Sequence, residues 1–262
     1  MQRRNKLLFE SKMRKLYLII IILTGMGIRL YCEKITVAVA ANVQYAFEDI
    51  STEFTKETGI EVVPIIGSSG KLTTQIKNGA PFEVFLSADT KYPEAIFNDK
   101  LASEEPFIYA CGSLVLWSAK LKEINCSPEY LESDRIKKIA IANPDTAPYG
   151  RATIEFFKNI GIYEKISSKL VYCESISQAN QYILSEAVDL GFTSKSTVMA
   201  SDMKGKGKWT EVNESTYSAI DQSAVLLKYG TDNHPEGSKK FYKFLKSKKA
   251  VSILENYGYI VK

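Results

Sequence analysis

The sequence predicts an α/β protein with two lobes. Each lobe is expected to be a mixed, mostly parallel sheet flanked by helices, and a two-stranded hinge joins the lobes. Strand patterns alternate with helix patterns after residue 33, an order typical of parallel sheets covered by helices. Apolar residues make up 45% of the 262 residues, enough for a substantial core. The last strand pattern is expected to return to the first lobe, so that the chain crosses between the lobes twice.

Three strand patterns, each followed by a helix pattern, build the first lobe. The strands are expected at residues 35–40, 60–66 and 83–87. Apolar residues from Ala46 to Phe54 recur at helical spacing after the first strand, and Gly59 is the expected end of that helix. Asp89 is the predicted N-cap of the third helix.

The second lobe repeats this alternation. Its strands are expected at residues 113–118, 139–142, 170–173 and 188–193, with helices at 150–159 and from residues 174–177 onward. A strand within residues 222–229 and helices at 236–246 and 249–257 then complete the first lobe. We therefore assign residues 34–112 and 223–262 to lobe one and 113–222 to lobe two. Small-ligand sites favour clefts between such lobes, which close about a hinge.

The N-terminus, residues 1–32, is predicted to be a signal peptide, and the start is either Met1 or Met13. Basic residues up to Lys15 precede an apolar stretch at 16–26. That stretch is shorter than the roughly 20 residues of a membrane-spanning helix. A permanent N-terminal anchor is the alternative. Lipid attachment at Cys32 has weak support, because Arg29-Leu-Tyr lacks the small residue that normally precedes a lipid-modified cysteine.

The net charge argues against a nucleic-acid partner. The chain has a formal charge of +4, but residues 1–32 contain seven of its 34 bases and one of its 30 acids. The remaining chain is therefore slightly acidic, and the support for binding a polyanion is lost.

Catalytic motifs are missing from the sequence. Gly67-Ser-Ser-Gly-Lys71 differs from a nucleotide-binding loop, because Ile65 and Leu72 occupy positions that need Gly and Ser or Thr. The only histidine, His234, lies in a turn-like stretch, and the cysteines lack zinc or redox spacing. We therefore predict a binding protein and not an enzyme. An exported enzyme on this scaffold and a sensor domain are the alternatives, and neither has a supporting motif.

Four junctions between a predicted strand and the next helix form the candidate site. A helix start carries unpaired N–H groups and the positive end of the helix dipole, which together favour an anion. A neutral site of this kind needs no buried Lys or Arg, which would be costly to desolvate. The ordinary alternative is that each Ser or Asn is a helix cap. The residues at these junctions are Asn42, Ser68, Ser69, Tyr149 and Ile176.

After residue 33 the sequence resembles the periplasmic molybdate-binding proteins of ABC transporters. The resemblance is carried by Ile-Thr-Val-Ala-Val-Ala-Ala-Asn at 35–42, Gly-Ser-Ser-Gly-Lys-Leu at 67–72, Asn-Gly-Ala-Pro at 78–81, Val-Phe-Leu-Ser-Ala-Asp at 84–89 and Ala-Pro-Tyr-Gly at 147–150. It implies a type II periplasmic-binding-protein fold that binds molybdate or tungstate as an intact tetrahedral oxyanion.

The same resemblance implies the ligands of the anion. In lobe one they are Ala41, through its backbone, together with Asn42 and Ser69. In lobe two they are Tyr149 and Ile176, largely through backbone N–H groups. One branch of the family has a ligand tyrosine where Ser194 stands here, so Ser194 is left out. Ala41 replaces a hydroxyl residue of some relatives, so one side-chain bond is expected to be missing.

The partners follow from this assignment. We expect a monomer without a cofactor, exported from the cytoplasm, that delivers its anion to an ABC transporter membrane permease. The alternative is the same fold with another small anion, such as sulfate, phosphate or an organic acid. Carboxylate binders usually use an arginine, and only Arg151 lies near a site motif.

Overall fold

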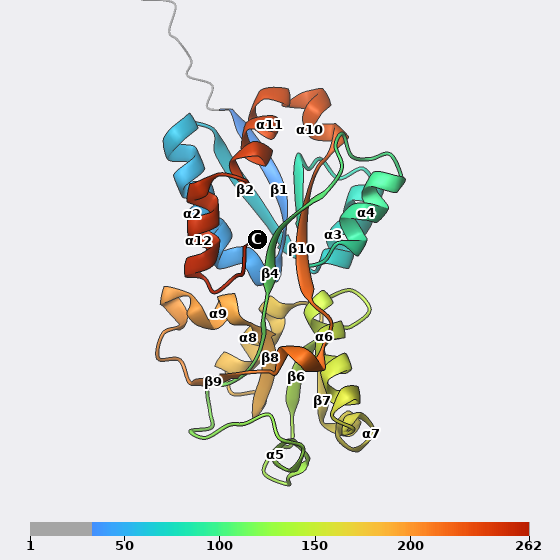
Figure 1. Cartoon of the computed structure of the whole chain (residues 1–262), viewed down its shortest axis with the longest axis vertical. Coiled ribbons are helices and arrows are strands. Elements are labelled where there is room, and N and C mark those ends of the chain that lie inside the picture. Colours follow the sequence, from blue (N-terminus) through green and yellow to red (C-terminus); the bar gives the residue numbers. More distant parts are fainter. Residues whose placement is uncertain (1–32, 262) are drawn as a thin grey trace, which may run out of the picture. The chain divides into compact units, whose positions relative to one another are not determined.

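The structure, a computed structural model, describes residues 33–261, so the predicted signal peptide lies outside it. Within this range the strands form two five-stranded sheets, each flanked by helices (Figure 1). No helix between residues 33 and 261 combines the length and apolar character that a membrane crossing requires.

Sheet one has the strand order β2-β1-β3-β10-β4. β1 pairs in parallel with β2 and β3, whereas β10 runs antiparallel to its neighbours β3 and β4. Four of its five strands therefore point the same way, and the predicted mixed, mostly parallel sheet is confirmed. The strands are β1 (Lys34–Ala40), β2 (Glu61–Gly67), β3 (Val84–Ser87), β4 (Phe107–Gly112) and β10 (Ile220–Leu226).

Helices cover both faces of sheet one (Figure 1). Successive side chains of a strand point to opposite faces, so Val37 packs in one cluster with Phe47 and Phe241, while Ala38 packs in another with Leu72 and Ile96. The helices of this lobe are α2 (Gln44–Thr58), α3 (Ser69–Lys77), α4 (Lys91–Asn98), α10 (Lys228–Asn233), α11 (Pro235–Phe244) and α12 (Lys248–Asn256).

Sheet two has the same plan, with the order β7-β6-β8-β5-β9. β6 is parallel to β7 and β8, and β5 is antiparallel to β8 and β9. Its strands are β5 (Leu114–Ser118), β6 (Ile139–Ala142), β7 (Leu170–Cys173), β8 (Leu190–Ser194) and β9 (Lys208–Glu211). The helices are α5 (Pro128–Glu132), α6 (Pro148–Asn159), α7 (Tyr163–Ile166), α8 (Ile176–Leu184) and α9 (Lys195–Met199).

Two neighbouring strands carry the chain between the sheets. The chain leaves sheet one after β4 and returns in β10, and these strands pair directly, with Gly112 opposite Ile220. The predicted two-stranded hinge is confirmed. β10 begins two residues before the predicted position.

Most predicted elements are present, and the differences have local causes. Gly59 ends α2 in the left-handed conformation, with a φ of 72°, which a residue without a Cβ adopts at little cost. Asp89 lies one residue before Thr90, the N-cap of α4, yet its carboxylate still accepts the Tyr92 backbone N–H at 3.3 Å. β4 and β9 lack a clear alternating pattern and are not predicted.

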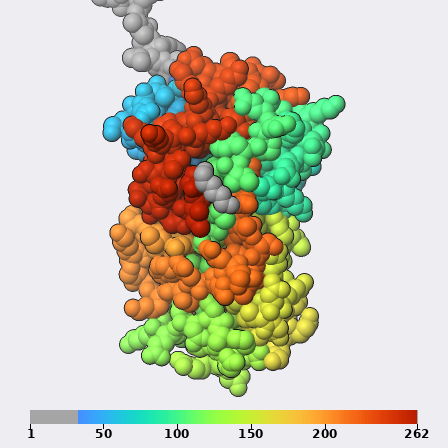
Figure 2. All heavy atoms as spheres, viewed as in Figure 1, coloured from blue at the N-terminus to red at the C-terminus, as the bar shows by residue number. Residues whose placement is uncertain are grey.

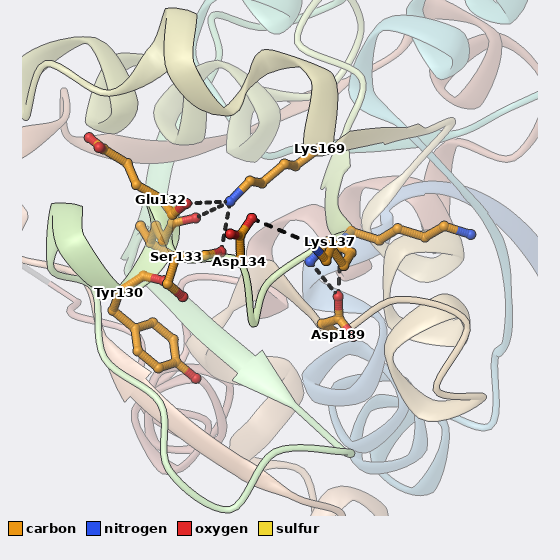
Figure 3. A network of polar contacts seen from close by, with 9 residues as sticks. Tyr130, Glu132, Ser133, Asp134, Lys137, Lys169 and Asp189 are labelled. Atoms are coloured by element: carbon orange, nitrogen blue, oxygen red, sulfur yellow. Dashed lines mark hydrogen bonds and ion pairs between the residues drawn. The ribbon is translucent and has the colours of Figure 1, made fainter.

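Two charged side chains anchor the far end of lobe two (Figure 3). The Lys169 Nζ donates to the carbonyl oxygens of Glu132 at 2.7 Å and Ser133 at 2.9 Å, at the end of α5, where a cation is favoured. Asp189 accepts the backbone N–H groups of Lys137 at 2.7 Å and Lys138 at 3.0 Å, just before β6. The Asp189 contacts hold the segment just before β6 in place, and β6 leads to α6.

Replacing Asp189 with asparagine is expected to lower the free energy of unfolding by about 1–3 kcal/mol near neutral pH. Partial burial raises the pKa of Asp189, but hydrogen bonds from Lys120, Lys137 and Lys138 outweigh it and hold the pKa below its usual value. The carboxylate therefore stabilises the fold above its unfolded pKa of about 3.9, and this contribution is lost as the pH falls through the folded pKa.

Chemical denaturation at about pH 7 and about pH 3 measures this effect. The deficit of the Asp189→Asn variant should shrink at the lower pH. Asp134→Asn is the control, because the Asp134 side chain is fully exposed and contacts only Lys137, at 3.5 Å. Equal deficits at both pH values would contradict the assigned role of Asp189.

Candidate functional site

The predicted site residues lie at four junctions where a parallel strand ends and a helical segment begins. β1 leads into the short 3₁₀ turn Ala41–Val43, which continues into α2, and β2 leads into α3. In lobe two, β6 precedes α6, and β7 leads into α8. Ligands of open α/β sheets bind at this edge. The fold therefore places every predicted site residue at the edge of the sheet where binding is expected.

Contacts between the lobes bring these four junctions together. The Gly70 N–H of α3 donates to the Thr146 carbonyl oxygen before α6 at 2.9 Å, and the Ser177 hydroxyl of α8 donates to the Gln44 side chain of α2 at 2.9 Å. α9 of lobe two also packs against the 3₁₀ turn Ala41–Val43 and α2 of lobe one, and on the face shown in Figure 2 its orange atoms lie next to the red C-terminal segment. All six predicted residues are buried, with exposed fractions of at most 4%: Ala41, Asn42, Ser68, Ser69, Tyr149 and Ile176.

The two serines at the start of α3 do not act as ordinary helix caps. Ser68 occupies the N-cap position, but its side chain makes no capping hydrogen bond. Its buried Oγ has no hydrogen-bond partner in the part of the chain that the structure describes. The Ser69 Oγ accepts the Ala88 N–H at 3.0 Å, which leaves its hydroxyl proton available. Because an unsatisfied buried hydroxyl is costly, this pair is suited to a polar ligand.

Asn42 uses its side chain for the protein and not for a ligand. Its Nδ2 donates to the Gln222 Oε1 at 2.7 Å and to the Tyr259 hydroxyl at 3.0 Å. An amide nitrogen has two protons, so both are engaged. A contact from Asn42 to an anion would therefore come from its backbone N–H, which differs from the side-chain donor that the sequence suggests.

Lobe two offers backbone donors. Pro148 is the first residue of α6 and has no N–H, so Tyr149 carries the first free amide of that helix. The Tyr149 hydroxyl faces the hinge, where it accepts the Gln222 Nε2 at 3.2 Å, and burial raises its pKa well above 10. Ile176 is the first residue of α8, after the N-cap Ser175, whose hydroxyl accepts the Gln178 N–H.

The six predicted residues carry no charge, and Arg151, the cation beside the start of α6, is paired with a carboxylate. Arg151 of α6 forms an ion pair with Asp89 of lobe one and lies over the Tyr92 ring, 5.6 Å from its centroid. Within residues 33–261 there is no cluster of three His, Cys, Asp or Glu side chains that could hold a metal ion. The arrangement therefore offers hydrogen-bond donors to an anion and no ligand set for a cation.

The site is backed by buried polar residues that the sequence does not predict. Gln222, Ser196 and Tyr259 are buried and contact Asn42. They lie more than 150 residues from Asn42 in the chain, and no local pattern indicates their role. Ser194, which is not among the predicted ligands, also lies beside Asn42, with its hydroxyl 3.4 Å from the Asn42 carbonyl oxygen.

Comparisons with known proteins show which family the chain resembles. The family profile described as bacterial extracellular solute-binding protein matches residues 35–260. The molybdate-binding protein ModA of Azotobacter vinelandii is 38% identical over 227 residues, which cover 86% of this chain and 89% of that protein. ModA of Rhodobacter capsulatus is 38% identical over 237 residues, or 90% of this chain and 92% of the relative.

A solved structure extends the similarity to the fold. The periplasmic molybdate-binding protein of Azotobacter vinelandii superposes with a TM-score of 0.82 at 35% identity, covering 87% of this chain and 99% of that structure. The resemblance predicted from the motifs is thereby confirmed. The chain belongs to the bacterial extracellular solute-binding protein family.

Proposed function

We propose that this protein is the extracytoplasmic solute-binding component of an ABC transporter that captures molybdate or tungstate between its lobes and delivers it to a membrane permease. The main support for the proposal is that four uncharged helix starts come together in a buried place. The Ser68 hydroxyl among them has no hydrogen-bond partner within residues 33–261. The two ModA relatives, which are named for binding molybdate, support it.

The donors suit a fully deprotonated tetrahedral anion. Backbone N–H groups of Ala41, Asn42, Ser69, Tyr149 and Ile176 and the hydroxyls of Ser68 and Ser69 would each donate to an anion oxygen. Among these groups only the two serine hydroxyls can also accept a hydrogen bond, and the Ser69 oxygen already accepts the Ala88 N–H. A fully deprotonated anion therefore matches the set better than a protonated phosphate. No carboxylate or imidazole among these residues would activate a serine, so we propose that the site binds its ligand without reacting with it.

We propose that the anion is released when the lobes open about the hinge. The lobes, whose boundaries we place near residues 112 and 222, would separate about the β4–β10 pair and open the four junctions to solvent. We place the monomer outside the cytoplasm after removal of residues 1–32, where it would meet its permease.

Calorimetric titration of the mature chain with molybdate, tungstate, sulfate and phosphate, each added separately, tests the function. Tight one-to-one binding of molybdate and tungstate, without heat from sulfate or phosphate, is expected. Tight binding of sulfate alone would favour the alternative ligand. An absence of binding with all of these anions would contradict the oxyanion proposal.

The two serines should respond differently to substitution. In Ser69→Ala the anion loses a donor and the Ala88 N–H loses its acceptor, so both affinity and stability should fall, the affinity by about 1–3 kcal/mol. In Ser68→Ala no hydrogen bond within residues 33–261 is lost, so the ligand-free protein should be at least as stable as the wild type, while molybdate binds more weakly.

Thermal unfolding with and without molybdate separates these effects. Thr73→Val is a control on the same helix, because its hydroxyl donates only to the Ser69 carbonyl oxygen within α3. Unchanged molybdate affinity in both serine variants would contradict the assignment of this helix start.

A further inference from the structure

Gln222 connects the two halves of the proposed site. It lies in β10, one of the two strands that cross between the lobes, and is fully buried. Its Oε1 accepts the Asn42 Nδ2 at 2.7 Å, and its Nε2 donates to the Tyr149 hydroxyl at 3.2 Å. One side chain of the hinge therefore binds a lobe-one and a lobe-two residue of the site at the same time.

The amide of Gln222 is well matched to this place. Its oxygen accepts a second hydrogen bond from the Tyr109 hydroxyl of β4, at 2.9 Å, so both hinge strands contribute. An amide carries an acceptor and a donor on one planar group, and both are used here. A purely apolar side chain of similar volume would leave Asn42, Tyr109 and Tyr149 without these partners in a buried place, which is costly.

Two further side chains hold Asn42, one from each lobe. The Ser196 hydroxyl of the short helix α9, in lobe two, donates to the Asn42 carbonyl oxygen at 2.6 Å. The Tyr259 hydroxyl, in lobe one, accepts the second Asn42 Nδ2 proton at 3.0 Å. Asn42, whose backbone N–H faces the proposed site, is therefore oriented from both lobes, and its contact with Ser196 requires the closed arrangement.

We infer that Gln222 is a positioning residue. By holding Asn42 and Tyr149 at a fixed distance and orientation, it aligns the backbone donors of both lobes with the bound oxyanion. This inference rests on the proposed function. Gln222 acts through its two partners and need not touch the anion. Its role explains why a polar side chain is kept at a fully buried position in the hinge.

The groups around Gln222 keep their charge state over the usual pH range. Burial raises the pKa of Tyr259 to about 12 and raises the pKa values of Tyr109 and Tyr149 well above 10. Wild-type binding should therefore show no pH dependence from these tyrosines between about pH 5.5 and about pH 8.5. A pH dependence introduced at position 222 can then be measured against a flat background.

The experiment compares molybdate affinity in the wild type, Gln222→Leu and Gln222→Glu across that pH range, with thermal unfolding of each. Leucine removes all three hydrogen bonds of the Gln222 side chain at every pH, so affinity should fall at least about tenfold with a flat pH profile. A protonated glutamic acid keeps one acceptor and one donor, so Gln222→Glu should bind nearly as the wild type at low pH and weaken as it ionises. Asp221→Asn, on the same strand and outside the proposed site, should bind as the wild type.

The outcomes separate the two proposals. If the wild type does not bind molybdate, the proposed function fails. If the wild type binds and Gln222→Leu binds equally well, the positioning role is overturned, even if Gln222→Glu repels the anion when ionised. A second outcome would also overturn the positioning role. If Gln222→Leu binds molybdate weakly and Gln222→Glu binds it equally weakly at low pH, the loss of hydrogen bonds at position 222 is not the cause of the weaker binding.

Discussion

Replacing Gly150 with alanine is expected to weaken molybdate binding by more than about a hundredfold, close to abolition. A Cβ at this position would lie 2.1 Å from the Ala142 carbonyl oxygen and 2.8 Å from its carbonyl carbon. These are backbone atoms of β6, which is paired on both sides within sheet two and cannot easily move aside. The start of α6 must shift instead, and the Tyr149 and Gly150 amides would lose their alignment with lobe one. Overpacking of this kind also lowers stability, typically by about 1–3 kcal/mol.

Gly161→Ala is the matched control, because Gly161 follows the opposite end of the same helix. Its φ of 76° disfavours alanine, but no atom within 4 Å would meet the new Cβ. This variant should lose about 1 kcal/mol of stability and keep its affinity. Calorimetry and thermal unfolding of both variants decide the matter. Wild-type affinity in a folded Gly150→Ala protein would show that the start of α6 is not part of the site.

Removing the Arg151 guanidinium is expected to speed anion release about tenfold to a hundredfold. Arg151 and Asp89 form an ion pair across the lobes, and their side chains are only 30% and 15% exposed. In Arg151→Met the Asp89 carboxylate stays in the closed interface without this partner, a situation that costs more than the loss of an exposed pair. The closed form becomes less favourable, and the effect should fall mainly on the dissociation rate. Stopped-flow fluorescence with tungstate or molybdate measures both rates.

The chain provides a matched control for this prediction. Lys71 and Glu174 also form an ion pair between the lobes, but their side chains are 54% and 57% exposed. Exposed pairs contribute little in water, so Lys71→Met should leave the dissociation rate nearly unchanged. Equal effects of Lys71→Met and Arg151→Met, or no effect of either, would contradict the role assigned to the buried pair.

The local patterns of the sequence predict the sheets and the four junctions well. β7 coincides with the predicted strand at residues 170–173, and Gly59 ends α2 as expected. These features depend on neighbours in the chain, such as apolar spacing and a glycine stop. β4 and β9 escape prediction because their exposure is irregular: Ile108 in β4 is 55% exposed, and β9 has no buried residue.

The finer chemistry of the site depends on distant residues and could not be predicted. A serine before a helix looks the same in sequence whether its hydroxyl caps the helix, as Ser175 does, or stays unpartnered, as Ser68 does. Likewise, nothing near Asn42 in the chain indicates that Gln222 and Tyr259 occupy its amide protons. These distinctions arise only when the lobes meet.

Diffraction at the molybdenum absorption edge, from crystals of the mature protein grown with molybdate, would locate the bound anion. One strong anomalous peak is expected, enclosed by the Asn42, Ser69, Tyr149 and Ile176 junctions. The metal should keep all its oxo ligands, with only N–H and O–H groups of the protein around them. A peak at a charged surface patch, or a protein side chain bonded directly to the metal, would contradict capture of an intact oxyanion by neutral helix starts.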